Sequence, residues 1–424
     1  MAKRTKPRAS KTPAAAKTRA AAKTPATGKT RAATQTPAAV KARVAPKARP
    51  AAKALATSMV RLAAPGVRSL TPYRPGKPIS ELERELGISN VVKLASNENP
   101  LGPSPRAVEA AQAALAEMAR YPDGNGFALK RALAARLCVA PDQITLGNGS
   151  NDVLDLVARA FATPRDEVVF SQYAFAVYPI ATRAVGARAV VTPARDFGHD
   201  LGAMRGAVGP RTRVVFVANP NNPTGTWNDA RSLEVFLQAL PDHVIAVVDE
   251  AYQEYVGEPD YPDCVPWVAR YPNLVVTRTF SKAYGLAGLR VGYAVSRPEV
   301  ADLLNRVRHP FNVNSVALAA AEAALGDDDH LARAVALNRA GLAMLTAAFD
   351  RLGLAYIPSV GNFVSVHVGA PAAPIYDALL REGVIVRPVD NYGMPDHLRV
   401  TVGLEAENQR FVAALEKVLG RGRV

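Results

Sequence analysis

Cysteine is nearly absent from this chain of 424 residues, which contains only Cys138 and Cys264. Two cysteines so far apart form neither a disulfide framework nor a C-x-x-C motif, which argues against a disulfide-rich secreted protein. Histidine is also scarce, and its six residues show no spacing typical of a metal site, so no metal is expected. No apolar run approaches the roughly 20 residues that cross a bilayer. The composition therefore predicts a cytoplasmic protein that does not span a membrane.

Acidic residues are missing from the amino terminus, where Glu81 is the first carboxylate. Residues 1–61 hold 16 Lys or Arg, so the rest of the chain has 36 basic and 37 acidic residues, although the whole has a formal net charge of +15. Large apolar side chains are almost absent before Val40. Residues 1–65 cannot bury enough apolar surface to fold and are predicted to form a disordered basic tail.

Three interpretations of this tail remain open. Its near-repeats of Lys, Ala, Pro and Thr resemble the basic segments of histone-H1-like proteins, and a polycation binds nucleic acid by counterion release. An Arg-rich leader without acids is also typical of an organelle transit peptide. Translation that begins at Met59 would omit the tail. We favour this start, or a tail without function, so nucleic acid is an expected partner only if the tail is translated and functional.

Short apolar runs alternate with helix-like stretches between residues 144 and 295. This alternation predicts an α/β fold with a mainly parallel sheet covered by helices. The Ala-rich stretch 331–352 suits a helix that links two domains. We expect an arm at 66–100, a large domain at 101–309 and a smaller α+β domain at 310–424.

Residues 279–290 are the most informative stretch of the chain and follow a strand-like apolar run. Lys282 lies beside the hydroxyl residues Thr279 and Ser281 and eight positions before Arg290. Hydroxyls and a planar guanidinium together can bind a phosphate dianion. A lysine after a strand's carboxyl end lies where open α/β sheets bind ligands and can react as an amine. The combination indicates pyridoxal phosphate held by Lys282 as a Schiff base, against the alternative of an ordinary solvated lysine.

Two further strand-like runs end in residues that suit the same cofactor. Asp249 closes the apolar run 244–248, where a carboxylate can pair with a protonated pyridine nitrogen. Tyr252 could donate to the phenolic oxygen of the ring. Asn222 precedes Pro223, which favours an extended backbone that can aim the amide inward. An Asp at such a junction also commonly caps the next helix, and this role stays open for Asp249.

A glycine-containing loop, residues 147–149, joins a fourth strand-like run to a helix-like stretch. Ser150 and Asn151 follow it, and the amides at a helix start bind phosphate well. The loop is not a dinucleotide-binding fingerprint, because Asp152 occupies the position of the third glycine. Ser150 and Asn151 are equally suited to capping the helix.

Together these motifs resemble the fold-type-I pyridoxal-phosphate aminotransferases of class II. The resemblance to the histidinol-phosphate aminotransferases among them is closer, because it extends to residues 70–73, 94–105, 120–123 and 398–403 in the family's order. It covers the chain from about Val67 to the carboxyl terminus. It implies a homodimer that converts L-histidinol phosphate and 2-oxoglutarate to imidazole acetol phosphate and L-glutamate by a ping-pong reaction in histidine biosynthesis.

The resemblance also implies roles for single residues. Lys282 corresponds to the lysine that moves a proton between substrate and cofactor. Asp249 corresponds to the partner of the pyridine nitrogen, and Asn222 and Tyr252 to the residues at the ring oxygen. The residues implied to bind the cofactor phosphate are Ser150, Asn151, Thr279, Ser281 and Arg290, with Tyr121 reaching it from the neighbouring subunit. Phe175 stands where the family generally has a tyrosine stacked on the ring, so the stacking face is kept and the hydroxyl is lost.

The residues implied to choose the substrate are two arginines and a tyrosine. Arg399 resembles the carboxylate-binding arginine of the superfamily, Arg387 a second arginine of the histidinol-phosphate branch, and Tyr73 a tyrosine that contacts the substrate. Two guanidinium groups can bind both a phosphate and a carboxylate. Exposed strand positions for both arginines stay open. So do two activities of the same fold, an aromatic-amino-acid aminotransferase and a phosphothreonine-type decarboxylase.

Overall fold

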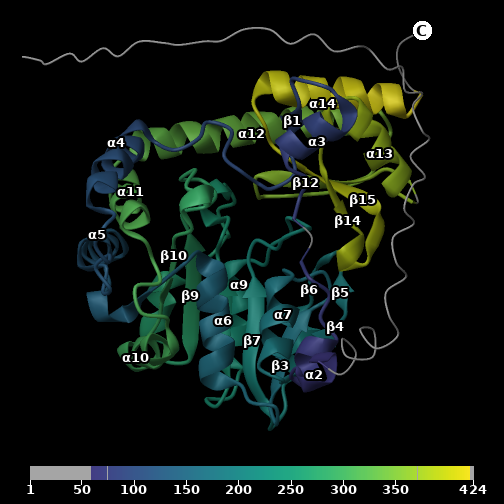
Figure 1. The fold of residues 1–424 in the computed structure, drawn as a ribbon. Coiled ribbons are helices and arrows are strands. Elements are labelled where there is room, and N and C mark those ends of the chain that lie inside the picture. Colours follow the sequence, from purple (N-terminus) through teal and green to yellow (C-terminus); the bar gives the residue numbers. More distant parts are fainter. Residues whose placement is uncertain (1–58, 74, 370, 421–424) are drawn as a thin grey trace, which may run out of the picture. The chain divides into compact units, whose positions relative to one another are not determined.

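A computed structural model describes residues 59–73, 75–369 and 371–420, all within one compact unit. The predicted tail therefore lies almost wholly outside the described residues. A seven-stranded sheet forms the centre of the unit (Figure 1). In spatial order its strands are β2 (Ile144–Gly147), β10 (Gly292–Val295), β9 (Leu274–Thr279), β8 (Ile245–Asp249), β7 (Thr212–Ala218), β3 (Glu167–Ser171) and β4 (Arg188–Thr192).

The strands are parallel except β10, which is antiparallel to both of its neighbours. The carboxyl ends of β7, β8 and β9 therefore lie at one edge, where Asp249 stands in register with Ala218 and Thr277. The predicted α/β fold with a mainly parallel sheet is confirmed. Each of the three loops that leave this edge carries predicted site residues.

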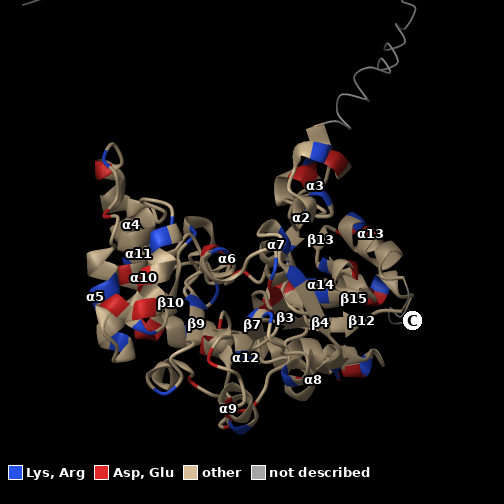
Figure 2. Ribbon diagram, turned by 90° about the horizontal axis from the view of Figure 1, so that it is seen from below, with Lys and Arg blue, Asp and Glu red and all other residues tan. Residues whose placement is uncertain are grey.

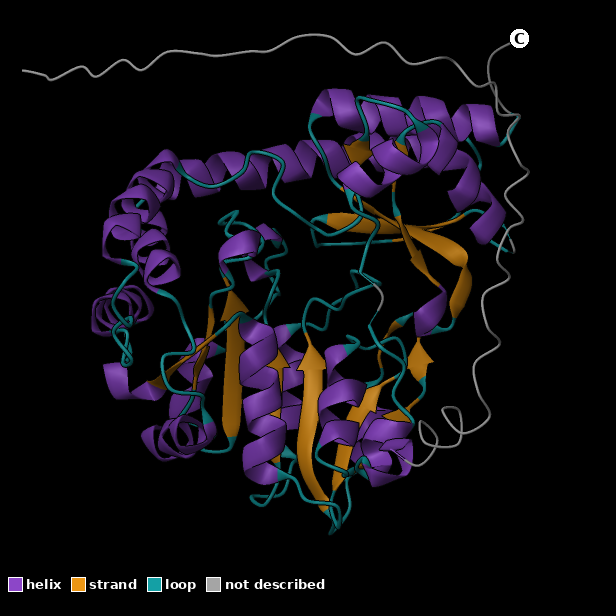
Figure 3. Cartoon of the chain, viewed as in Figure 1, coloured by secondary structure: helices purple, strands orange, loops and turns teal. Residues whose placement is uncertain are grey.

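Helices cover both faces of the sheet (Figure 3). They do so because the strands bury alternate side chains in two separate cores. On β7, Val214 and Phe216 enter one core, and Val215 and Val217 enter the other. The first core is completed by α6 (Ser150–Phe161), α7 (Val177–Ala184) and α10 (Pro298–Val307). The second includes α5 (Phe127–Leu137), α8 (Leu201–Gly206), α9 (Ala230–Gln238) and α11 (Ser315–Leu325), with Ala107 of α4 (Pro105–Ala114). Burial on both faces explains why these strands are nearly continuous apolar runs.

A second, smaller sheet is antiparallel and consists of β11 (Tyr356–Ile357), β12 (Phe363–His367), β15 (Met394–Thr401) and β14 (Arg387–Val389). Its core also contains the carboxyl end of α12 (Asp328–Arg351), α13 (Ala373–Arg381) and α14 (Glu405–Val418). The arm joins this part, because β1 (Val92–Lys93) pairs with β13 (Val384–Ile385) and Leu82 of α3 (Ile79–Leu86) packs near Ile385.

The remaining elements are short. They are α2 (Pro65–Arg68), β5 (Ala194–Arg195), β6 (Gly198–His199) and the 3-10 turns η1 (Leu115–Glu117), η2 (Pro141–Gln143), η3 (Gln253–Tyr255), η4 (Val265–Ala269), η5 (Ala287–Leu289) and η6 (Asp390–Tyr392).

The division into an arm at 66–100, a large domain at 101–309 and a small domain at 310–424 stays a prediction. The packing favours a later boundary, because α11 belongs to the core of the large sheet together with α4 and α5. The long helix α12 then runs from this core to that of the small sheet (Figure 1). We therefore place the boundary within α12.

Basic and acidic residues are interspersed along the described helices (Figure 2), in keeping with the near balance of charge after the tail. None of the helices in the described part combines the length and hydropathy needed to cross a bilayer. Within the same ranges, no group of three or more His, Cys, Asp or Glu is arranged to hold a metal ion.

Candidate active site

A cavity of about 240 Å³ lies at the carboxyl edge of the large sheet, between that sheet, the arm and the small sheet. Thirteen of the fourteen predicted site residues line it. They are Tyr73, Ser150, Asn151, Phe175, Asn222, Asp249, Tyr252, Thr279, Ser281, Lys282, Arg290, Arg387 and Arg399. Residues that are more than 300 positions apart thus meet in one place.

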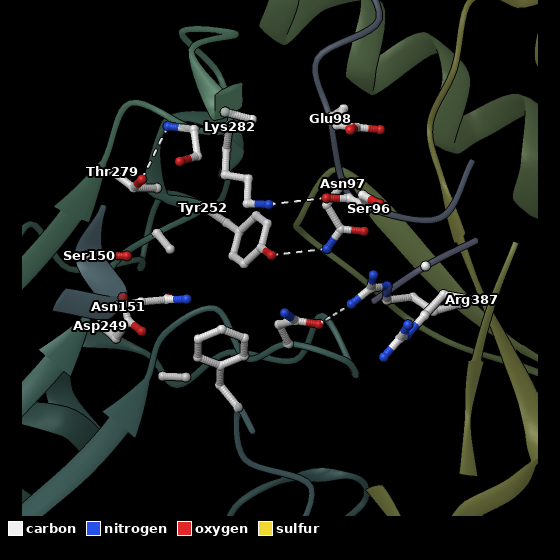
Figure 4. Close-up of a pocket in the computed structure, with 18 of the residues that line it drawn as sticks. Ser96, Asn97, Glu98, Ser150, Asn151, Asp249, Tyr252, Thr279, Lys282 and Arg387 are labelled. Atoms are coloured by element: carbon white, nitrogen blue, oxygen red, sulfur yellow. Dashed lines mark hydrogen bonds between the residues drawn. The ribbon is translucent and has the colours of Figure 1, made fainter. Parts of the chain in front are cut away.

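Lys282 extends from the loop after β9 into this cavity (Figure 4). Its Nζ donates a hydrogen bond of 3.2 Å to the carbonyl oxygen of Ser96 and lies 5.6 Å from the ring centroid of Tyr252. Burial, and then the positive charge of Arg399, lower the pKa of Lys282 to about 7. A large fraction of the amine is therefore uncharged near neutral pH, and the alternative of an ordinary solvated lysine is excluded.

Asp249 is buried at the end of β8, with 4% of its surface exposed. Its two carboxylate oxygens accept hydrogen bonds from different side chains, one from Tyr178 at 3.0 Å and one from Thr277 at 2.9 Å. Burial raises the pKa of Asp249 to about 6, and the two hydrogen bonds oppose this rise. Asp249 is not a helix cap, because the next turn, η3, has Tyr252 as its N-cap.

The loop between β2 and α6 forms an anion-binding corner of the cavity. Gly149 is the N-cap of α6, and neither Ser150 nor Asn151 caps the helix. Gly149 has φ +80°, and a Cβ there would lie 2.5 Å from Nη2 of Arg290. Arg290 in turn donates to Oγ of Ser281 at 3.2 Å. Helix-start amides, hydroxyls and a guanidinium thus converge on one point, which suits a phosphate.

These features fit pyridoxal phosphate. The anion-binding corner can bind the phosphate, and buried Asp249 can pair with a protonated pyridine nitrogen. The amine of Lys282 can react with the carbonyl carbon. Phe175 borders the same cavity, with its ring edge-on to Tyr178 at a centroid distance of 5.9 Å. The cofactor itself would supply the electron sink that no side chain of the cavity provides.

Both predicted substrate arginines are buried on neighbouring strands of the small sheet, so exposed strand positions are excluded. Arg399 donates through Nη1 to Oδ1 of Asn222 at 2.5 Å and through Nη2 to the carbonyl oxygen of Ala95 at 2.7 Å. Its Nε is buried without a hydrogen-bond partner among the described residues. Arg387 lies over the ring of Tyr73, 5.4 Å from the centroid. An anion in the cavity would meet two guanidinium groups.

Tyr121 is the one predicted site residue outside this cavity. Its side chain is 83% exposed and stacks on Phe311 at a centroid distance of 4.7 Å. The single chain therefore does not bring Tyr121 to the anion-binding corner. Its predicted contact from a neighbouring subunit stays a prediction.

Three residues that hold the predicted ones in place were not predicted from the sequence. Tyr178 and Thr277 orient Asp249, and Asn97 donates to the hydroxyl of Tyr252 at 2.9 Å. Asn97 lies in the stretch 94–105 that contributed to the family resemblance, but no role was predicted for it. The register of β8 and β9 places Thr277 beside Asp249, and a strand pairing of this kind is the signal that could have found it.

The chain is similar to known proteins over most of its length. Residues 89–415 match the family model described as aminotransferase class I and II. Histidinol-phosphate aminotransferase 2 of Pseudomonas fluorescens (strain Pf0-1) is 62% identical over 370 residues, which is 87% of this chain and 100% of that protein. Histidinol-phosphate aminotransferase 1 of Nitrosococcus oceani is 61% identical over 359 residues, 85% of this chain and 97% of that protein.

A solved structure gives the same result. The crystal structure of histidinol-phosphate aminotransferase from Sinorhizobium meliloti, in complex with pyridoxal-5'-phosphate, superposes with a TM-score of 0.77 at 32% identity and covers 85% of this chain and 98% of that one. The predicted family and fold are confirmed. This chain belongs to the class I and II aminotransferases and, within them, to the histidinol-phosphate aminotransferases.

Proposed function

We propose that the chain transfers the amino group of L-histidinol phosphate to 2-oxoglutarate, giving imidazole acetol phosphate and L-glutamate in histidine biosynthesis, in the cytoplasm. The observation that carries this proposal is one cavity that contains both the amine of Lys282, whose pKa is lowered to about 7, and two buried guanidinium groups, Arg387 and Arg399. An amino-group donor with a phosphate ester and an acceptor with carboxylates both need such a pairing of amine and cations. The identity of 62% with a named histidinol-phosphate aminotransferase supports the same choice of substrate.

Pyridoxal phosphate is the cofactor, and when bound it supplies a carbonyl carbon that accepts amines and a ring that delocalises the electron pair left on the substrate Cα. Ser150, Asn151, Thr279, Ser281 and Arg290 would hold its phosphate. Asp249 would stay ionised beside the pyridine nitrogen, because Tyr178 and Thr277 already donate to it. Phe175 would lie against the ring.

Lys282 would take a proton from the substrate Cα and return it on the cofactor side. A general base works best when its pKa is near the operating pH, and the pKa of Lys282 is about 7. Burial and Arg399 produce this value together. The carbonyl oxygen of Ser96 accepts a hydrogen bond from Nζ and holds the amine within the cavity.

Arg387 and Arg399 would bind the anionic end of each substrate in turn. Arg399 is held by Asn222 and Ala95, which leaves its buried Nε free to donate. Arg387 is positioned by the face of Tyr73 through a cation–π contact. Two fixed cations bind a phosphate dianion more tightly than one would, and they still accept a carboxylate.

The active form would be a homodimer in which Tyr121 completes the anion-binding corner of the partner subunit. Tyr121 is exposed together with other large apolar or aromatic side chains of the same region, which are Leu115, Met118, Phe127 and Phe311. Exposed apolar side chains gathered in one region mark a contact surface. A second copy of the chain would cover them.

Absorbance spectra of half-reactions test the substrate. L-Histidinol phosphate, added to the enzyme loaded with pyridoxal phosphate, is expected to convert the bound cofactor to its amine form rapidly, and 2-oxoglutarate is expected to restore the original spectrum. Rapid conversion by L-phenylalanine with none by L-histidinol phosphate would instead establish an aromatic-amino-acid aminotransferase. Release of CO₂ from a phosphorylated amino acid would point to the decarboxylase.

A further inference from the structure

Asn97 links the arm, the large sheet and the small sheet beside the cavity. It is 1% exposed, and its Nδ2 donates a hydrogen bond of 2.9 Å to the hydroxyl of Tyr252 (Figure 4). The backbone oxygen of Asn97 accepts from Nδ2 of Asn362, and its backbone N–H donates to Oγ1 of Thr401 at 2.9 Å. The two backbone hydrogen bonds fix the main chain of Asn97, and its side chain bonds Tyr252 through Nδ2 and Thr401 through Oδ1, so the amide has one orientation.

The direction of each hydrogen bond follows from the chemistry of the groups. The backbone N–H of Asn97 can only donate, so the hydroxyl oxygen of Thr401 accepts it and the Thr401 proton points elsewhere. Oδ1 of Asn97 lies 3.1 Å from that hydroxyl and accepts this proton. With Oδ1 so placed, Nδ2 must face Tyr252, and an amide nitrogen can only donate.

The hydroxyl of Tyr252 therefore accepts from Asn97 and keeps its own proton for another acceptor. The charged or titratable groups that act on Tyr252 are Arg399, Tyr392 and Asp249, and none of them forms a hydrogen bond with its hydroxyl in the described structure. The ring of Tyr252 faces the amine of Lys282 in the same cavity. A ligand held at Lys282 is the remaining acceptor.

We propose that Asn97 is a positioning residue that directs the hydroxyl proton of Tyr252 toward the ring oxygen of the bound cofactor, an inference that rests on the proposed function. Donation from Asn97 also polarises the Tyr252 hydroxyl, because linked hydrogen bonds strengthen one another. The ionised ring oxygen is stabilised in this way. Asn97 acts through Tyr252 and does not itself contact the reacting atoms.

The substitution Asn97→Asp reverses this hydrogen bond. The backbone of Asn97 has φ +54°, which Asp tolerates nearly as well as Asn, and the carboxylate keeps an acceptor for Thr401. It cannot donate to Tyr252, so the Tyr252 proton turns toward position 97. The pKa read from the visible absorbance of the bound cofactor is expected to rise by about one unit, the shift that losing one hydrogen bond to a charged group produces.

A double-mutant cycle with Tyr252→Phe separates this role from the added charge. In the Tyr252→Phe background, Asn97→Asp is expected to shift the cofactor pKa only by its added charge, and therefore by clearly less than in the wild type, because no hydroxyl remains to redirect. An unchanged pKa in Asn97→Asp, or a shift of the same size in both backgrounds, would overturn the proposal. If the Asp variant does not fold, Asn97→Gly keeps the backbone conformation, removes the donor without adding charge, and enters the same cycle.

Asn338→Asp is the matched control. Asn338 is 3% exposed on α12, and its Nδ2 donates to the backbone oxygen of Gly361 at 3.0 Å. The variant is expected to lower Tm and to leave the absorbance titration unchanged. Failure of L-histidinol phosphate to convert the bound cofactor of the wild type to its amine form would contradict the proposed function instead.

Discussion

At the scale of single residues, the site depends on groups whose protonation is set by their surroundings. In water the side chains of Lys282 and Asp249 would both be charged near neutral pH. Burial lowers the pKa of the lysine to about 7 and raises that of the carboxyl to about 6. Neighbours then modify the effect of burial, since Arg399 lowers the pKa of Lys282 further and Tyr178 and Thr277 oppose the rise at Asp249. The sequence identifies the residue types, and the surroundings decide their charge.

The low pKa of Lys282 predicts how the stability of the cofactor-free protein depends on pH. Its pKa is about 7 in the folded chain and 10.5 by default in the unfolded chain, so the unfolded state binds more protons between these values and stability rises with pH across this window. Below pH 7 the full cost of burying the charge remains. Lys282→Met should therefore raise the free energy of unfolding by roughly 5 kcal/mol at pH 6, because the pKa of Lys282 is lowered from 10.5 to about 7 and each pKa unit corresponds to about 1.4 kcal/mol.

Thermal unfolding of the two cofactor-free proteins from pH 6 to pH 10 measures this effect. The advantage of Lys282→Met is expected to shrink steadily above pH 7 and to vanish near the upper end of the window. Lys417→Met, at a 70% exposed lysine of α14, is the control and should give a difference in Tm that does not vary over this range. A constant advantage for Lys282→Met would contradict the buried-charge explanation.

At the scale of elements, the segments that follow β2, β7, β8 and β9 bring together most of the residues predicted to bind the cofactor. The apolar runs predicted these strands, and the turn residues after them predicted the loops. Close packing between loops could not be predicted in this way. Gly149 is an example. A side chain at this position would collide with Arg290, which lies far along the chain and reaches the same corner.

Gly149→Ala should weaken binding of pyridoxal phosphate by about tenfold or more, because a Cβ displaces Arg290 and the backbone conformation at φ +80° is strained for alanine. Equilibrium titration of the cofactor-free protein with pyridoxal phosphate measures the loss. Gly288→Ala, in the turn just before Arg290, has nothing within 4 Å of its added Cβ and is expected to bind the cofactor like the wild type. Equal affinities for the two variants would show that the corner does not depend on Gly149.

At the scale of the whole molecule, one site draws residues from the arm, the large sheet and the small sheet. Tyr73 and Asn97 come from the arm, Lys282 from the large sheet, and Arg399 from the small sheet. The proposed dimer adds Tyr121 from a second copy. A site built from several parts of a chain forms only when all of them are folded and assembled.

Hybrid dimers test the contribution of the second subunit. Dimers of Lys282→Ala and dimers of Tyr121→Ala should each have little activity at limiting pyridoxal phosphate. A hybrid of the two variants contains one site in which Lys282 and the partner's Tyr121 are both intact, so about half of the wild-type activity should return. Differently tagged subunits allow the hybrid to be purified and assayed. A hybrid as inactive as its parents would mean that Tyr121 does not act across the interface.

Most of the strand pattern and the cofactor site followed from local signals. Continuous apolar runs ending in Asp249 or before Lys282 predicted strands of a buried parallel sheet, and the motifs predicted the cofactor, because both depend on residues close together in sequence. The domain boundary at residue 309 stays a prediction, and the packing of α11 in the core of the large sheet, which favours a later boundary, is a long-range contact. Long-range contacts leave no local pattern to detect.

The sequence by itself determined the fold class and the family, and it led to the proposal of Lys282 as the reacting residue, since periodicity, turn residues and ordered motifs are properties of neighbours along the chain. Only the tertiary structure decided which groups meet in space. It placed Arg399 beside Asn222, Tyr178 beside Asp249, and Asn97 between Thr401 and Tyr252. Hydrogen-bond direction and pKa depend on distance and burial, which exist only once the chain is folded.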